Sequence, residues 1–85
     1  MNSIKTNILN KHCYTELVYQ RINKKLKTAF SKGEIEILIY EILLETNEHD
    51  YRKTGKNFYI INTSRNITIT INSYTYRIIT VTKQR

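Results

Sequence analysis

The sequence predicts an α+β domain in which two helices are followed by a three-stranded antiparallel meander, arranged as two layers. Two observations lead to this class. In the first half of the chain, apolar residues recur every three to five positions, which is the spacing of one helical face. From residue 57 onward the period shortens to two, and β-branched and aromatic residues dominate. The length of 85 residues predicts one domain over residues 1–85.

The N-terminal part of the chain divides into an arm and a helical region. Residues 1–12 have few apolar positions and weak periodicity, so we predict a flexible arm or a short helix there. A helical hairpin is predicted over residues 14–46. Its first helix follows Thr15, a residue type that caps helix N-termini. Lys24 and Lys27 are expected to turn away from the apolar face of this helix, toward solvent.

The second helix of the hairpin, about residues 32–46, begins at the sequence SKGE, which matches a capping box. In this motif the Ser31 side chain accepts a hydrogen bond from the backbone of Glu34, and the Glu34 side chain accepts one from the backbone of Ser31. The apolar face of this helix is unusually broad. We therefore expect the helix to lie between the first helix and the sheet, with Leu38 and Ile42 in the core.

The C-terminal part of the chain carries the strand signals. The segment NEHDYRKTGKN at 47–57 is polar and contains Gly55, so we interpret it as a loop. A β-meander is predicted over residues 57–83, with short turns near NTSR and NSYT. In its middle strand, isoleucines alternate with Thr68 and Thr70, which places the isoleucines against the helices and the threonines outward. The strands are expected at residues 57–61, 66–71 and 76–82.

The net charge of +7 is distributed in three blocks. Residues 1–33 contain seven basic residues and one acidic residue, and residues 51–85 contain seven basic residues and no acidic residue. Between them, residues 34–50 contain six acidic residues and no lysine or arginine. If the two basic blocks share a face of the fold, that face attracts a phosphate backbone or an acidic protein surface.

Composition also bears on location and on metal binding. Cys13 is the only cysteine, so it cannot form an internal disulfide, and it fits a reducing compartment. No apolar run approaches 18 residues, so we expect a cytoplasmic protein with neither a membrane span nor a secretory signal. His12 with Cys13, and His49 with Asp50, form two separate pairs along the chain. We therefore predict no metal site, and no cofactor.

The residue types of the predicted sheet favour binding over catalysis. Residues 51–85 contain no Asp, Glu, His or Cys, so acid–base chemistry on the sheet would have to use Tyr, Lys or Arg. Tyr59, Tyr74 and Tyr76 fall on strands or at a turn, near several arginines. Aromatic residues interleaved with Arg on an open sheet can stack nucleobases while the cations hold phosphates. The alternative is a solvated face whose Thr and Tyr residues only favour strand formation.

Two resemblances to known families accompany these patterns. The sequences CYTELVYQRINKKL, GKNFYI and RNITITINSYTYRIITV resemble an uncharacterised bacterial domain-of-unknown-function family, which implies no activity. Residues 57–85 are similar to the closing strands of the RelE/ParE toxin superfamily, where two helices precede a curled sheet. RelE-type members use Arg, Lys and Tyr of this sheet to cleave RNA on the ribosome. This resemblance implies a toxin–antitoxin role, in which Tyr76 or Lys83 assists attack by the ribose 2′-hydroxyl and Arg77 stabilises the phosphate transition state.

From these observations we expect a small, non-enzymatic binding module that engages RNA, DNA or a nucleoprotein complex. One alternative is a RelE/ParE-like ribonuclease toxin. Another is an inhibitor or regulator encoded by a phage or mobile element, which binds a host nuclease or defence protein. An uncovered sheet edge would also allow two chains to pair as a dimer. The predicted contact residues are Lys24, Lys25, Lys27, Arg65, Tyr76, Arg77, Lys83 and Arg85.

Overall fold

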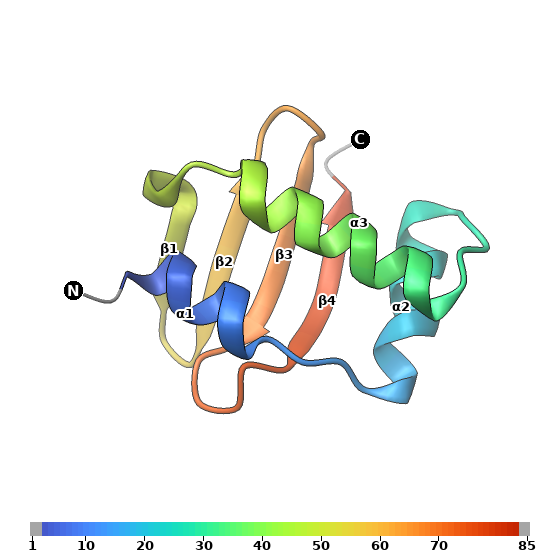
Figure 1. The fold of residues 1–85 in the computed structure, drawn as a ribbon, viewed down its shortest axis with the longest axis horizontal. Coiled ribbons are helices and arrows are strands. Elements are labelled where there is room, and N and C mark those ends of the chain that lie inside the picture. Colours follow the sequence, from blue (N-terminus) through green and yellow to red (C-terminus); the bar gives the residue numbers. More distant parts are fainter. Residues whose placement is uncertain (1–2, 84–85) are drawn as a thin grey trace.

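The computed structural model describes residues 3–83, and over this range the chain has the expected α+β fold, with three α-helices and a four-stranded antiparallel sheet (Figure 1). The helices are α1 (Ile4–Lys11), α2 (Glu16–Leu26), α3 (Lys32–Glu45) and the short 3₁₀ helix η1 (Glu48–Asp50). The strands are β1 (Tyr51–Thr54), β2 (Asn57–Asn62), β3 (Ile67–Asn72) and β4 (Ile78–Lys83), and they lie in that order across the sheet. None of the helices in the described range has the length and hydropathy needed to cross a bilayer.

The N-terminal segment forms a helix, so the short-helix interpretation of residues 1–12 is correct over its described part. Ser3 caps this helix, because its side chain accepts a hydrogen bond from the backbone N–H of Thr6 at 3.0 Å. Ile8 is fully buried and anchors α1 in the core. At the other end of α1, the backbone N–H of His12 donates to the carbonyl of Ile8. The result is a third helix where the sequence predicts two.

The interpretation of segment 47–57 as a loop is wrong, because it contains η1 and β1. Strand β1 pairs with β2 along its whole length, from Tyr51 opposite Ile60 to Thr54 opposite Asn57. Only Tyr51 of β1 is buried, and its hydroxyl donates a hydrogen bond to the carbonyl of Leu43. A strand with a single buried residue has no visible alternation, so the sequence does not reveal it.

Helix α3 begins as the sequence predicts. The Ser31 side chain accepts a hydrogen bond from the backbone N–H of Glu34 at 3.2 Å, and the Glu34 carboxylate accepts one from the backbone of Ser31 at 2.8 Å. From this capping box the helix crosses the sheet, with α1 beside it on the same face (Figure 1). Its buried residues are Ile35, Ile39, Ile42 and Leu43.

The expected position of α3 between the first helix of the hairpin and the sheet is wrong. Helix α2 lies instead at the edge of the sheet, beside β4 (Figure 1). Its apolar face is narrow, with only Val18 and Ile22 buried, and Arg21 donates a hydrogen bond from Nη1 to the backbone carbonyl of Ile79 at 2.9 Å. The narrow apolar face of α2 is wide enough to pack beside β4, and Arg21 pairs with a backbone carbonyl at that sheet edge. Covering α3 would require a wider apolar face.

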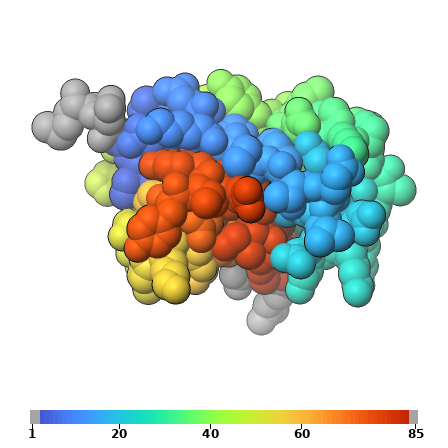
Figure 2. Space-filling model, turned by 90° about the horizontal axis from the view of Figure 1, so that it is seen from below, coloured from blue at the N-terminus to red at the C-terminus, as the bar shows by residue number. Residues whose placement is uncertain are grey.

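The start of β4 is closed by the segment that joins α1 to α2. The backbone N–H of Cys13 donates to the carbonyl of Tyr76 at 2.9 Å, and the backbone N–H of Ile78 donates to the carbonyl of Cys13 at 3.0 Å. Figure 2 shows this blue segment lying against the orange and red chain that enters β4. Together with α2, it covers the edge of the sheet at which β4 lies, and only β1 presents an uncovered edge among the described strands.

The alternation of β3 is confirmed. Ile67, Ile69 and Ile71 are buried toward the helices, and Thr68 and Thr70 alternate with them. Although Thr70 faces outward, it is buried, with only 8% of its surface exposed. Tyr59 and Thr80 flank it on the neighbouring strands.

The core predicts unequal costs for two substitutions in α3. Ile42 is fully buried, so Ile42→Ala should lower the free energy of unfolding by about 2–5 kcal/mol. Leu38 is only partly buried against the core, so Leu38→Ala should cost less. Urea unfolding followed by circular dichroism measures both. If Ile42→Ala does not fold, Ile42→Val provides a milder test, at about 0.5–1.5 kcal/mol. Equal losses at the two positions would contradict this orientation of α3.

Candidate functional site

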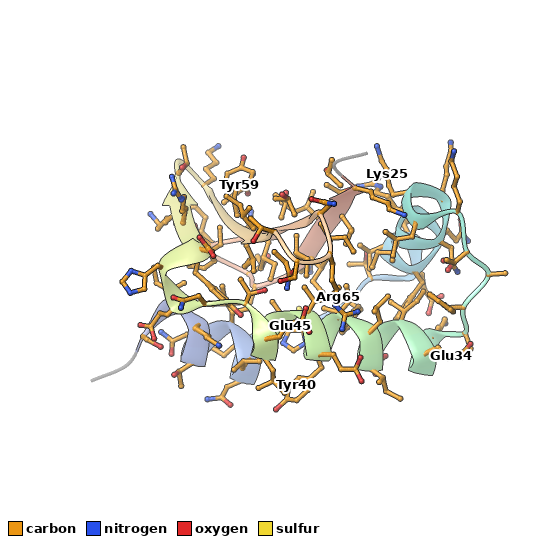
Figure 3. All side chains as sticks on the ribbon, turned by 90° about the horizontal axis from the view of Figure 1, so that it is seen from above. Lys25, Glu34, Tyr40, Glu45, Tyr59 and Arg65 are labelled. Atoms are coloured by element: carbon orange, nitrogen blue, oxygen red, sulfur yellow. The ribbon has the colours of Figure 1, made fainter. Side chains whose placement is uncertain are left out.

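One face of the sheet is covered by α1 and α3, and no helix of the described chain covers the other, which we call the open face (Figure 3). A row of four residues crosses the open face: Arg52 lies opposite Tyr59, Tyr59 opposite Thr70, and Thr70 opposite Thr80. Three inter-strand spacings of about 4.8 Å give this row a width of about 14 Å. We call these four residues the open-face row.

The row ends in a groove between β4 and α2. The groove has a volume of about 750 Å³. Its apolar part includes Leu17, which is 67% exposed, and at its floor the hydroxyl of Thr80 is buried without a hydrogen-bond partner. Lys24 and Lys25 line the same groove from α2. In Figure 3, Lys25 and Tyr59 point to the same side of the molecule, away from α3.

A second, smaller groove of about 270 Å³ adjoins the first at the ends of α2 and β4. Lys25, Lys27 and Lys83 line it together with Leu26. Lys27 terminates α2 in the left-handed conformation, with φ of 57°, and its backbone N–H donates to the carbonyl of Asn23. Among the described residues, no carboxylate lines either groove. We call Lys24, Lys25, Lys27 and Lys83 the lysine cluster.

The structure thus brings four of the eight predicted contact residues together. Arg65 does not lie with them, because its side chain points toward α3 and pairs with Glu45 (Figure 3). Its Nε donates to the Glu45 carboxylate at 2.7 Å, and its Nη2 donates to the same carboxylate at 3.1 Å. These hydrogen bonds lower the pKa of Glu45 below its ordinary value and raise the pKa of Arg65. Arg85 lies outside the described residues.

Tyr76 also lies apart from the lysine cluster. Its ring packs against Phe58, which is on the helix-covered face, with the two centroids 5.8 Å apart, and the Lys11 Nζ lies 5.5 Å from the Tyr76 centroid. Arg77 precedes β4, whereas Lys83 ends it, and six residues of extended chain span roughly 20 Å. The three residues suggested for toxin-like catalysis are therefore not brought together.

The sequence analysis does not find two cations of this surface, Arg52 and Arg21, and it names Tyr59 without assigning it to a face of the sheet. Arg52 was hidden because its strand was interpreted as a loop. Tyr59 follows Phe58, and the sequence left open which of the two faces outward. Arg21 lies four residues before Lys25 on the same side of α2, so counting helical turns from the lysines would have found it.

The chain was compared with known proteins. A family model described as "Protein of unknown function (DUF3781)" matches residues 6–82, which is nearly the whole chain. The chain belongs to the DUF3781 family. Searches of curated proteins and of solved structures found no match. The resemblance to an uncharacterised family is confirmed, and no comparison supports the RelE/ParE resemblance, which stays a prediction.

Residues of metal-ligating type are dispersed in this DUF3781 domain. Over residues 3–83, no three or more His, Cys, Asp or Glu residues form a group that could hold a metal ion. His12 and Cys13 lie between α1 and α2, whereas His49 and Asp50 belong to η1. The two pairs that the sequence contains do not form a joint site.

The contact between Arg65 and Glu45 predicts a pH dependence of stability. The folded-state pKa of Glu45 is below its ordinary 4.5, so the ion pair stabilises the fold above about pH 4.5. This contribution is lost as the pH falls through the lower, folded-state pKa. Wild type should therefore be more stable than Glu45→Gln at pH 7, and urea unfolding should show the difference shrinking at pH 3.

Glu48→Gln is the matched control for that experiment, because Glu48 forms no ion pair with any described residue. It should show no comparable pH-dependent difference. A Glu45→Gln deficit of equal size at pH 7 and pH 3 would rule out the charge of Glu45 as its cause.

Proposed function

We propose that this DUF3781 domain is a non-enzymatic module that binds single-stranded nucleic acid on its open face. The observation that carries the proposal is the surface formed by the open-face row and the groove beside α2, with no carboxylate among their described residues. The second groove continues this surface around the end of β4, where Lys83 lies opposite Ile67 and so on the helix side of the sheet. In this proposal the lysine cluster holds phosphates, and the open-face row contacts bases and sugars.

The electrostatics of this surface support a polyanion as ligand. Lys24, Lys25 and Lys27 come from the N-terminal basic block, and Lys83 and Arg52 come from the C-terminal one. No carboxylate of residues 3–83 lines the two grooves, so the described part of the chain does not neutralise these lysines there. Lysines that neutralise phosphates release condensed counterions, and this release drives binding at low salt.

The shape and polarity of the open face favour a single strand. Tyr59 offers an aromatic surface next to Arg52 on one side and Thr70 on the other. Tyr59 is partly exposed, and an aromatic on an uncovered sheet face can stack an unpaired base, which is not accessible in a duplex.

The chemistry of the surface supports binding without catalysis. Both grooves beside α2 are lined by Lys, Arg, Gln, Thr and aliphatic residues. Tyr76 and Arg77 lie at the opposite end of β4 from Lys83, so an acid, a base and a phosphate-stabilising cation do not converge there. A general acid or base must reach the reacting atom within hydrogen-bond distance, directly or through one water.

The proposal predicts that oligonucleotide affinity depends on salt concentration, and that Lys25 and Lys83 contribute to this dependence. Fluorescence anisotropy with a labelled oligouridine or oligothymidine should show affinity falling steeply between about 50 and 200 mM salt. The double variant Lys25→Gln/Lys83→Gln should bind more weakly, and its slope of log affinity against log salt should be shallower by about 1.4, or about 0.7 for each lost phosphate contact.

The control is Lys11→Gln/Lys32→Gln, which removes the same charge from the helices α1 and α3. It should change the slope much less, since neither lysine lines the two grooves beside α2. Equal effects of the two double variants would mean that net charge alone governs binding. No binding of either oligonucleotide at 50 mM salt would refute the proposal.

Tyr59 tests the stacking part of the proposal. Tyr59→Ala should weaken oligonucleotide binding by about 1–3 kcal/mol, the usual contribution of one stacked base, with little change in the salt slope. Tyr59→Phe should retain most of the affinity. Tyr74→Ala removes an exposed tyrosine of the β3–β4 turn and should have little effect. Unchanged affinity in Tyr59→Ala would exclude base stacking at this position.

A further inference from the structure

A third groove lies between α3, α2 and the segment that joins α1 to α2. Its volume is about 930 Å³, and it is lined mainly by Tyr14, Tyr19, Glu36, Ile37, Tyr40 and Glu41. Tyr40 points away from the sheet, to the side opposite Tyr59 and Lys25 (Figure 3). This groove therefore belongs to a different face from the proposed nucleic-acid surface, and nothing in the proposed function uses it.

The outer side of α3 is unusually apolar along this groove and for one turn beyond it, where Leu44 continues the apolar surface without lining the groove. Ile37 is 63% exposed, Tyr40 is 45% exposed and Leu44 is 48% exposed. Their spacing of three and four residues places them in one stripe along the helix. A contiguous apolar stripe with a polar rim is the pattern of an interaction surface, whereas single exposed apolar residues are common on any protein.

The wall of the groove opposite this stripe is held in place by side-chain contacts. Tyr14 and Tyr19 stack with centroids 5.3 Å apart and ring planes 11° apart. The Tyr19 hydroxyl donates to Glu36 at 2.6 Å, and this hydrogen bond raises the pKa of Tyr19 to about 12. The Tyr14 hydroxyl is buried without a hydrogen-bond partner. The aromatic wall is thus formed before any ligand arrives.

The charge of the groove indicates the kind of ligand. Residues 34–50 contain six acidic residues and no lysine or arginine. Glu36 forms no ion pair with a described residue, and Glu41 has only a long contact, at 3.8 Å, with Arg65. Lys32 lies beside the aromatic wall, with its Nζ 5.4 Å from the Tyr19 centroid, but it is paired with Glu16 at 2.6 Å. The carboxylates of Glu36 and Glu41 disfavour nucleic acid and anionic lipid as ligands. They also oppose self-association of α3 against α3, which would bring the same carboxylates together.

We propose that this groove binds a basic amphipathic helix of a partner protein. The apolar side of that helix packs on Ile37, Tyr40 and Leu44, and its lysines or arginines reach Glu36 and Glu41. Laying an amphipathic helix into an apolar groove is a common mode of peptide recognition. The inference does not depend on nucleic-acid binding, since the two surfaces face opposite sides of the molecule and can be occupied together.

The test uses the full chain and a fluorescein-labelled helical peptide of about 18 residues, with leucines at helical spacing and lysines at the other positions. A second peptide carries glutamates in place of the lysines. We expect the basic peptide to bind and the acidic one not to bind. In anisotropy titrations, the double variant Ile37→Ala/Tyr40→Ala should weaken binding about tenfold or more, although it keeps every charge.

Two further variants separate the groove from other surfaces. Tyr74→Ala also removes an exposed aromatic and should leave peptide affinity unchanged. Circular dichroism checks that Ile37→Ala/Tyr40→Ala remains folded, as expected for exposed positions. Glu36→Gln should reduce affinity for the basic peptide, although the amide oxygen of the new side chain can still accept the hydrogen bond from Tyr19.

Several outcomes would overturn the inference. Equal binding of the basic and acidic peptides would do so, as would binding that is insensitive to Ile37→Ala/Tyr40→Ala. Sedimentation of the chain without peptide could also overturn the inference. A concentration-dependent dimer that is lost in the double variant would mean that a second copy of the chain occupies the groove. Weaker oligouridine binding by the double variant would assign the groove to nucleic acid instead.

Discussion

The sheet has one apolar face, and this constraint determines most of the structure. Ile60, Ile69 and Ile71 line the inner side of adjacent strands and are fully buried. That side must be covered, and α1 and α3 cover it with residues such as Ile8 and Ile39. Within residues 3–83 no further helix covers the outer side, where Arg52 is exposed and Tyr59 and Thr80 are partly exposed. The open face is therefore a consequence of how the core is made.

The position of α2 links the fold to both candidate surfaces. By packing beside β4, α2 closes one edge of the sheet, and it carries Lys24 and Lys25 to the level of the open face. The same placement leaves the outer side of α3 without a covering helix. Had α2 packed on α3, the lysines would lie on the helix side of the molecule, and Ile37 and Tyr40 would be buried.

The parts of the fold that are encoded locally could be predicted from the sequence. The capping box of Ser31 and Glu34 and the alternation of β3 are properties of neighbouring residues, and both are found in the structure. Strand β1 could not be predicted, because it is held by pairing with β2 and buries only Tyr51. Likewise, the breadth of an apolar face indicates how much of a helix is buried, but not which element it packs against. Arg65 lies away from the predicted site because it pairs with Glu45, which is distant in sequence. No local sequence pattern indicates such a pair.

The separation of acidic α3 from the lysine cluster gives the molecule an electric dipole that runs from the helix layer toward the open sheet. In the field of a polyanion, a dipole of this direction turns the open face forward before any contact forms. Orientation of this kind increases the fraction of encounters that are productive, so it acts on the association rate more than on the lifetime of a complex. Its reach is limited to about 10 Å at 0.1 M ionic strength, which is the distance over which salt screens exposed charges.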